Sequence, residues 1–135
     1  MRVSEVNLAR AQKRFDTGEY DSAVFHASIA VESAANAMIL ELGGDEAKDH
    51  QAVSALATVL RRVKPELLKE ERYQQMIERG REIQREVVYA RYPLRVAGRW
   101  IAPMDYYTQE NAKEVIEDAG FLVEGVKAHL RRSGA

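Results

Sequence analysis

Residues 21–42 read DSAVFHASIAVESAANAMILEL and contain neither glycine nor proline. Small and apolar side chains recur along this stretch at steps of three and four residues, at Ala23, Ala27, Ala30, Val31, Ala34 and Met38. This spacing is typical of a helix that lays one face on a protein core. Further apolar residues, such as Phe25 and Ile29, lie outside that stripe. Because a helix that is apolar on more than one side needs several neighbours to cover it, we expect residues 21–42 to form the central helix of a bundle.

The chain on either side of this helix predicts its neighbours. Apolar periodicity predicts further helices over residues 3–15, 68–90 and 108–132, and another that begins at Asp49 or His50 and runs to Val63. Thr108 is a suitable N-cap for the last of them. The connection before Thr108 is long for a compact domain, and Ala97-Gly98 within it is compatible with the turn of a very short hairpin. We therefore predict one all-α domain over residues 1–135, an up-and-down bundle of four or five helices.

The composition excludes several classes of protein. The chain has 135 residues, a usual size for one domain with its own core, and it has no cysteine. Disulfide scaffolds, thiolate enzymes and cysteine-based metal sites are therefore excluded. The three histidines have no partners at a metal-ligand spacing, so we predict no metal and no cofactor. The N-terminus has no apolar signal core and no stretch approaches about 18 apolar residues, which predicts a cytoplasmic protein that does not enter a membrane.

Charge is nearly balanced overall but is unevenly distributed. The net charge is −1, so the whole chain has no global attraction to nucleic acid. Residues 15–60 carry one lysine and eight acidic residues, a sum of −7, whereas residues 61–99 carry eleven basic residues and six glutamates, a sum of +5. This asymmetry suits a basic groove, or two protomers that meet through opposite charges. The simpler interpretation is that these charged residues lie on the solvent-exposed faces of helices.

Several short motifs follow one another along the chain. Gly18, Tyr20 and Ala23 form a Gly-x-Tyr-x-x-Ala entry to the central helix, and residues 30–37 read AVESAANA. The series is completed by His50, by ARYP at residues 90–93, and by Tyr107-Thr108. Together these motifs resemble the HEPN domain family over nearly the whole chain. One departure is Asn36, because the family's Ala-x-Glu-(x)3-Lys-Ala stretch has lysine at that place.

The resemblance implies a helical bundle, often a homodimer, with one of two functions. One branch of the family contains metal-independent ribonucleases, often toxins, whose site is an arginine, four to six further residues and then a histidine. The other branch contains non-catalytic subunits that pair with a small nucleotidyltransferase and help to bind nucleotide or substrate. In this chain no arginine lies five to seven positions before His26, His50 or His129. The cation and the proton-transfer group that RNA cleavage needs are therefore missing at the family's spacing.

The favoured hypothesis is accordingly a non-catalytic binding module without catalytic residues of its own. It would be a homodimer that partners a small nucleotidyltransferase and contributes to nucleotide or substrate binding. Two alternatives stay open: an RNA-cleaving toxin with a displaced active site, and a purely structural dimerisation domain.

The predicted nucleotide contacts are Arg91, Tyr92, Arg95 and His50. Arg91 could grip a phosphate through its fork of donors, and Tyr92 could stack on a base. Each residue also has a structural interpretation. Arg91 could cap helix carbonyls, Tyr92 could anchor the loop, Arg95 could simply be exposed, and His50 could cap the third helix or fold onto the bundle.

Four further residues are given structural roles by the sequence. Trp100 is predicted to plug the long connection, with a contact at a protein interface as the alternative. Glu32 is predicted to pair with an arginine of the fourth helix, because a carboxylate on an apolar helix needs a partner. His26 is predicted to pack within the bundle, and His129 to lie near a helix C-terminus, where a cation is favoured.

Overall fold

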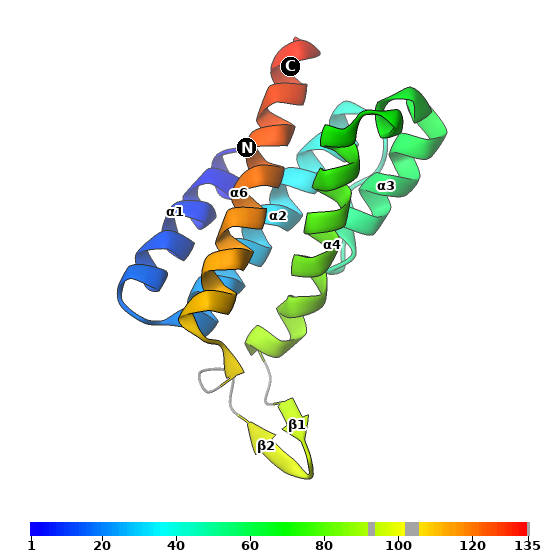
Figure 1. Ribbon diagram of the computed structural model, residues 1–135. Coiled ribbons are helices and arrows are strands. Elements are labelled where there is room, and N and C mark those ends of the chain that lie inside the picture. Colours follow the sequence, from blue (N-terminus) through cyan, green and yellow to red (C-terminus); the bar gives the residue numbers. More distant parts are fainter. Residues whose placement is uncertain (92–93, 102–105, 135) are drawn as a thin grey trace.

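The computed structural model describes residues 1–91, 94–101 and 106–134, without the side chains of residues 86–91, 94 and 96. Its elements are α1 (Arg2–Asp16), α2 (Tyr20–Glu41), α3 (Ala52–Val63), the 3₁₀ helix η1 (Pro65–Lys69), α4 (Glu71–Arg91), β1 (Leu94–Val96), β2 (Arg99–Ile101) and α6 (Gln109–Arg132). The long helices run alternately up and down one bundle, and β1 and β2 form a hairpin at the end where α4 stops (Figure 1). The predicted all-α, up-and-down bundle is confirmed.

α2 is the central helix, as predicted. It packs against α1, α3, α4 and α6, and Figure 1 shows α6 in front of it with α1 and α4 on either side. The predicted stripe is buried at every position, at Ala23, Ala27, Ala30, Val31, Ala34 and Met38. By length and composition alone α2 could also cross a membrane, but 56% of the stretch concerned is buried inside the bundle. Its place among four neighbouring helices accounts for its apolar character.

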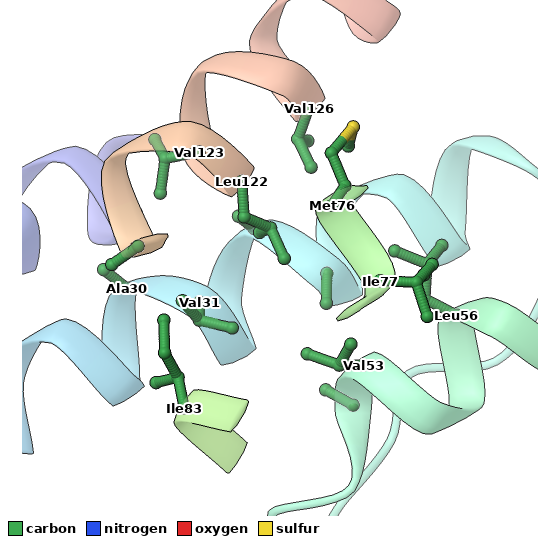
Figure 2. Close-up of a cluster of buried hydrophobic side chains, with 14 of the residues drawn as sticks. Ala30, Val31, Val53, Leu56, Met76, Ile77, Ile83, Leu122, Val123 and Val126 are labelled. Carbon is green, nitrogen blue, oxygen red and sulfur yellow. The ribbon is translucent and has the colours of Figure 1, made fainter. Parts of the chain in front are cut away.

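The largest part of the core lies where α2, α3, α4 and α6 meet. Figure 2 shows the side chains gathered there, among them Ala30, Val31, Val53, Leu56, Met76, Ile77, Ile83, Leu122, Val123 and Val126. Removing a side chain of this kind from water contributes roughly 1.5–3 kcal/mol. The bundle is therefore held together mainly by this cluster, and the polar features described below are built around it.

The ends of two helices show how well local signals predict boundaries. The predicted start of the fourth helix at residue 68 is wrong, because Pro65–Lys69 forms a separate 3₁₀ helix and the extended Glu70, with ψ 129°, interrupts the chain before α4. The predicted cap at Thr108 is confirmed. Its Oγ1 accepts a hydrogen bond from the backbone N–H of Asn111 at 3.1 Å, which satisfies one free donor of the first turn of α6.

Gly80 lies where α4 meets α3 and α6, and it gives a test of this packing. A Cβ added there would stand 2.6 Å from Leu122 Cδ1 and 2.9 Å from Val53 Cγ1, whereas a Cβ at Gly120 would meet nothing within 4 Å. We expect Gly80→Val to lower the free energy of unfolding by about 2–3 kcal/mol through overpacking. The control, Gly120→Ala, should raise it by about 0.5–1 kcal/mol through helix propensity. Urea unfolding measures both, and an unaltered Gly80→Val protein would contradict this packing.

Candidate functional site

A two-stranded hairpin continues the chain beyond the end of α4. Its strands are antiparallel, and the paired residues are Leu94 with Ile101, Arg95 with Trp100 and Val96 with Arg99. Ala97 and Gly98 both have positive φ, at 51° and 78°, as a two-residue hairpin turn requires. The short hairpin predicted around Ala97-Gly98 is confirmed.

Arg95 and Trp100 form an exposed cross-strand pair on this hairpin. The guanidinium carbon of Arg95 lies 5.8 Å from the centroid of the Trp100 ring, which is within reach of a cation–π contact. Trp100 is 70% exposed, and the side chains of Arg95 and Arg99 are exposed as well. The prediction that Trp100 plugs the connection is therefore wrong. The hairpin projects from the bundle instead of folding back onto it (Figure 1).

The predicted nucleotide contacts fall in two parts of the chain. Arg91 is the last residue of α4 and Arg95 lies in β1, so these two belong to consecutive elements at one end of the bundle (Figure 1). His50 lies in the loop between α2 and α3. Tyr92 lies outside the described residues, as does the side chain of Arg91. The contact of these residues with a nucleotide stays a prediction.

His50 folds back onto α2. Its Nδ1 lies 2.7 Å from Oε1 of Glu32, with side chains 43% and 24% exposed. The predicted pairing of Glu32 with an arginine of the fourth helix is wrong, because among the described residues His50 takes that place. The chain reverses at Gly43, whose φ is +85°, and Asn36 holds the returning loop by accepting the backbone N–H of Ala47 at 2.9 Å. Where the family has lysine, this chain thus has an amide that ties a loop to α2.

A buried polar network, not predicted from the sequence, joins α2, α4 and α6. His129 is 4% exposed, its Nε2 lies 2.6 Å from Oε2 of Glu41, and its Nδ1 lies 2.9 Å from the Tyr73 hydroxyl. The guanidinium of Arg132 donates to the same hydroxyl oxygen at 2.6 Å. The network thus links the last residue of α2, the first turn of α4 and the last turn of α6, and His129 lies near the C-terminal end of its helix, as predicted.

Most of the network is shielded from solvent. Tyr73 is 1% exposed, and burial raises the pKa of Tyr73 above its usual value. One signal in the sequence could have found the network. His129 lies three residues after the buried Val126, so it is a polar residue on the apolar stripe of α6.

An acidic cavity of about 240 Å³ lies between α4 and the start of α6. Its lining residues are Glu82, Ile83, Tyr106, Tyr107, Asn111, Glu114, Val115 and Asp118. Burial raises the pKa of Asp118, against the opposing charge of Arg79, whose Nη1 lies 3.7 Å from Oδ1 of Asp118. Within the part of the chain that the structure describes, no group of three or more histidine or acidic side chains is placed to hold a metal ion.

His26 on α2 provides a test through pH. Its Nδ1 lies 3.1 Å from Oδ1 of Asn7, and burial, followed by the charges of Arg10 and Arg14, lowers the pKa of His26. The imidazole of His26 therefore binds a proton more readily in the unfolded chain than in the folded one. The contribution of neutral His26 to the free energy of unfolding is fully present above its ordinary pKa of 6.5, and it is lost as the pH falls through the lower pKa of the folded protein. We expect the free energy of unfolding in urea to fall less between about pH 7 and pH 5 in His26→Gln than in the original protein. Parallel pH profiles would contradict this assignment.

The chain also has measurable similarity to known proteins. The HEPN domain profile matches residues 1–129. A protein of Methanocaldococcus jannaschii named "Putative toxin MJ1304" is 27% identical over 128 residues, which cover 95% of this chain and 84% of that relative. No solved structure matches the chain. Since the family profile covers all but the last residues of the bundle, the chain belongs to the HEPN domain family.

Proposed function

We propose that this chain is the non-catalytic subunit of a two-component pair. In this proposal it is a cytoplasmic homodimer that binds a small nucleotidyltransferase and helps that partner to hold nucleotide or substrate. The observation that carries the proposal is the projecting hairpin with its exposed Arg95–Trp100 pair.

The hairpin has the chemistry of a protein-binding element. Tryptophan and arginine are the residue types most enriched among those that dominate binding energy at protein interfaces. Trp100 is 70% exposed, which is the largest exposed fraction among the exposed large hydrophobic side chains of the described residues. Its ring offers a large apolar area that a partner could remove from water, while Arg95 and Arg99 supply charge beside it. A narrow ribbon that projects from a bundle is also suited to enter a concave surface.

Two observations favour binding over catalysis. No arginine stands at the family's ribonuclease spacing from a histidine. His129, moreover, is buried and bonded to Glu41 and Tyr73, so it has no free nitrogen for proton transfer. The relative in Methanocaldococcus jannaschii is named as a toxin, which supports a toxin–antitoxin setting for the pair.

The nucleotide contacts proposed for the pair are Arg91, Tyr92, Arg95 and His50. Arg91 and Arg95 belong to consecutive elements at the hairpin end of the bundle, so a partner bound to the hairpin would lie beside them. Guanidinium groups at such a boundary suit the phosphates of a nucleotide that the partner holds.

Co-expression tests this function. The full chain is produced together with the nucleotidyltransferase encoded nearest to it, and the tagged partner is purified and passed over a sizing column. We expect the two proteins to elute as one complex, and we expect the chain alone to leave a labelled RNA intact. If the two proteins eluted separately and the RNA stayed intact, the result would favour the alternative that the chain is a structural dimerisation domain. RNA cleavage by the chain alone would favour the second candidate, an RNA-cleaving toxin with a displaced site, which the name of the relative supports.

A further inference from the structure

One side of α2 is only partly covered by the other helices. It lies opposite the buried stripe of that helix, and we call it the outer face of α2. Its residues, none of which is buried, are Ser22, Phe25, His26, Ile29, Glu32, Ser33, Asn36, Ala37 and Leu40. They follow one another at steps of one and three residues, which keeps them on one side of a helix. The outer face therefore runs along nearly the whole length of α2.

The outer face presents little polarity to the solvent. Its larger polar side chains already have partners within the chain, as Glu32 lies beside His50, Asn36 binds Ala47 and His26 lies beside Asn7. Its remaining members are serine or apolar residues. A helix side that faces water normally carries charged and polar residues. The composition of the outer face is closer to that of a surface that another protein covers.

Large apolar side chains and a hollow lie at the C-terminal half of the outer face. After Trp100, the largest exposed fractions among the exposed large hydrophobic side chains of the described residues are those of Val3 and Leu40, at 59% and 54%. Both side chains line a hollow of about 420 Å³. Its other lining residues are Met1, Glu32, Ser33, Asn36, Ala37 and Glu46. Exposed apolar surface of this kind marks sites of protein–protein contact.

The order of side chains along the outer face fits a second copy of α2 that runs in the opposite direction. With a twofold axis at Ser33, Ile29 of each protomer lies opposite Ala37 of the partner subunit, because both are four residues from the axis. A large side chain then meets a small one on each side of the axis. The small Ser33 at the crossing lets the two helices approach closely. The surface is thus complementary to itself, as a twofold interface requires.

The charges at the two ends of the outer face are complementary under the same axis. Arg10 on α1 lies near His26, because its positive charge helps to lower the pKa of His26. At the other end, Glu46 lines the hollow together with Leu40. Arg10 and Glu46 are both exposed, and no ion pair within the described residues engages either of them. An antiparallel second copy brings the end with Arg10 to the end with Glu46, twice in each dimer.

We propose that two copies of this chain associate through the outer face of α2, with a twofold axis at Ser33. Ile29 packs on Ala37 of the partner subunit, and Arg10 pairs with Glu46 of the partner subunit at both ends. The inference rests on the proposed function, which contains a homodimer, and adds the surface through which the homodimer forms. The outer face shares no residue with the hairpin, so the hairpin stays free for the nucleotidyltransferase.

Analytical ultracentrifugation of the purified full chain tests this surface. We expect a dimer with twice the 15.3 kDa mass of one chain. Ser33→Glu sets two negative charges against each other at the axis, and it should raise the Kd of the dimer by about a hundredfold or more. The far-UV circular dichroism of Ser33→Glu should stay that of the original protein, because Ser33 is not buried within the chain.

A charge exchange gives a second test that does not depend on Ser33. Arg10→Glu and Glu46→Arg should each raise the Kd of the dimer by about tenfold, because each sets like charges together at both ends. The double variant should bring the Kd back toward the original value. Lys13→Glu makes the same change of charge on the side of α1 opposite the buried Ser4 and Ala11, and it should leave the Kd nearly unchanged.

Four results would overturn the inference. A chain that sediments as a monomer would also remove the homodimer from the proposed function. A dimer that Ser33→Glu leaves intact would show the surface to be wrong and leave the proposed function standing. A double charge variant no tighter than the single ones would contradict the pairing of Arg10 with Glu46. Dissociation by Gly120→Glu but not by Ser33→Glu would place the interface at a groove of about 530 Å³ between α1 and α6, where a Cβ at Gly120 meets nothing within 4 Å.

Discussion

We expect Trp100→Ala to weaken the proposed complex between this chain and a small nucleotidyltransferase by about thirtyfold or more. Truncating a hot-spot tryptophan costs about 2 kcal/mol or more of binding free energy, which corresponds to that factor. The ring is 70% exposed in the free chain, so a partner that covers it removes a large apolar area from water. Calorimetric titration of the partner into the original and variant chains measures the change in Kd.

Two controls keep this result specific. Leu40→Ala removes another exposed apolar side chain, 54% exposed on α2, and should leave the Kd of the complex nearly unchanged. The free energy of unfolding of Trp100→Ala should also stay close to that of the original protein, because the described contact of the ring is the exposed one with Arg95. An unchanged Kd in Trp100→Ala would show that the hairpin is not part of the interface.

The second large effect concerns stability. His129→Ala should lower the free energy of unfolding by about 3 kcal/mol, because it leaves the carboxylate of Glu41 and the hydroxyl of Tyr73 without their common partner in a nearly buried place. The two side chains of the Glu41–His129 pair are only 16% and 5% exposed, so water cannot replace the lost bonds freely. Urea unfolding at neutral pH measures the loss.

Matched variants show whether the loss comes from the network. Tyr73→Phe keeps the ring and removes only the hydroxyl, and should cost about 1–2 kcal/mol. His50→Ala breaks the pair with Glu32 at a half-exposed position, so its loss should stay below about 1 kcal/mol. If His129→Ala cost no more than His50→Ala, the network would not hold the ends of α2, α4 and α6 together.

The elements of the fold were predictable because their signals are local. The alanine spacing of α2 follows from the 3.6-residue period of a helix, and that helix is buried as expected. Thr108 caps α6 through a donor three residues away, and Ala97-Gly98 turns within two residues. Features of this kind depend on neighbours in the sequence, so the sequence contains what is needed to predict them.

The side-chain partners were not predictable in the same way. Glu32 and His50 are 18 positions apart, Tyr73 and His129 are 56 apart, and Glu41 and His129 are 88 apart. Such pairs depend on how helices pack, which no local period encodes. For Trp100, exposure depends on whether the hairpin folds onto the bundle or projects from it, and both arrangements fit the same residues.

The uneven distribution of charge lies between these two cases. The excess positive charge of residues 61–99 indicated a basic surface, and a basic groove was one interpretation of it. The sequence could not select Arg61, Arg81 and Arg85 from the other basic residues of this segment. That selection depends on the packing of α3 against α4, which places the last turn of one helix beside the middle of the other.

The most direct measurement of the central claim uses Trp100 itself, because it is the only tryptophan in the chain. Its fluorescence, and the quenching of that fluorescence by acrylamide, report whether the hairpin is covered. A nucleotidyltransferase whose own tryptophans have been replaced by phenylalanine serves as the titrant. We predict strong quenching in the free chain, and a blue-shifted, protected emission once the partner is bound. Protection already present in the free chain, or quenching that the bound partner leaves unchanged, would contradict the account of this chain as a subunit that binds its partner through the hairpin.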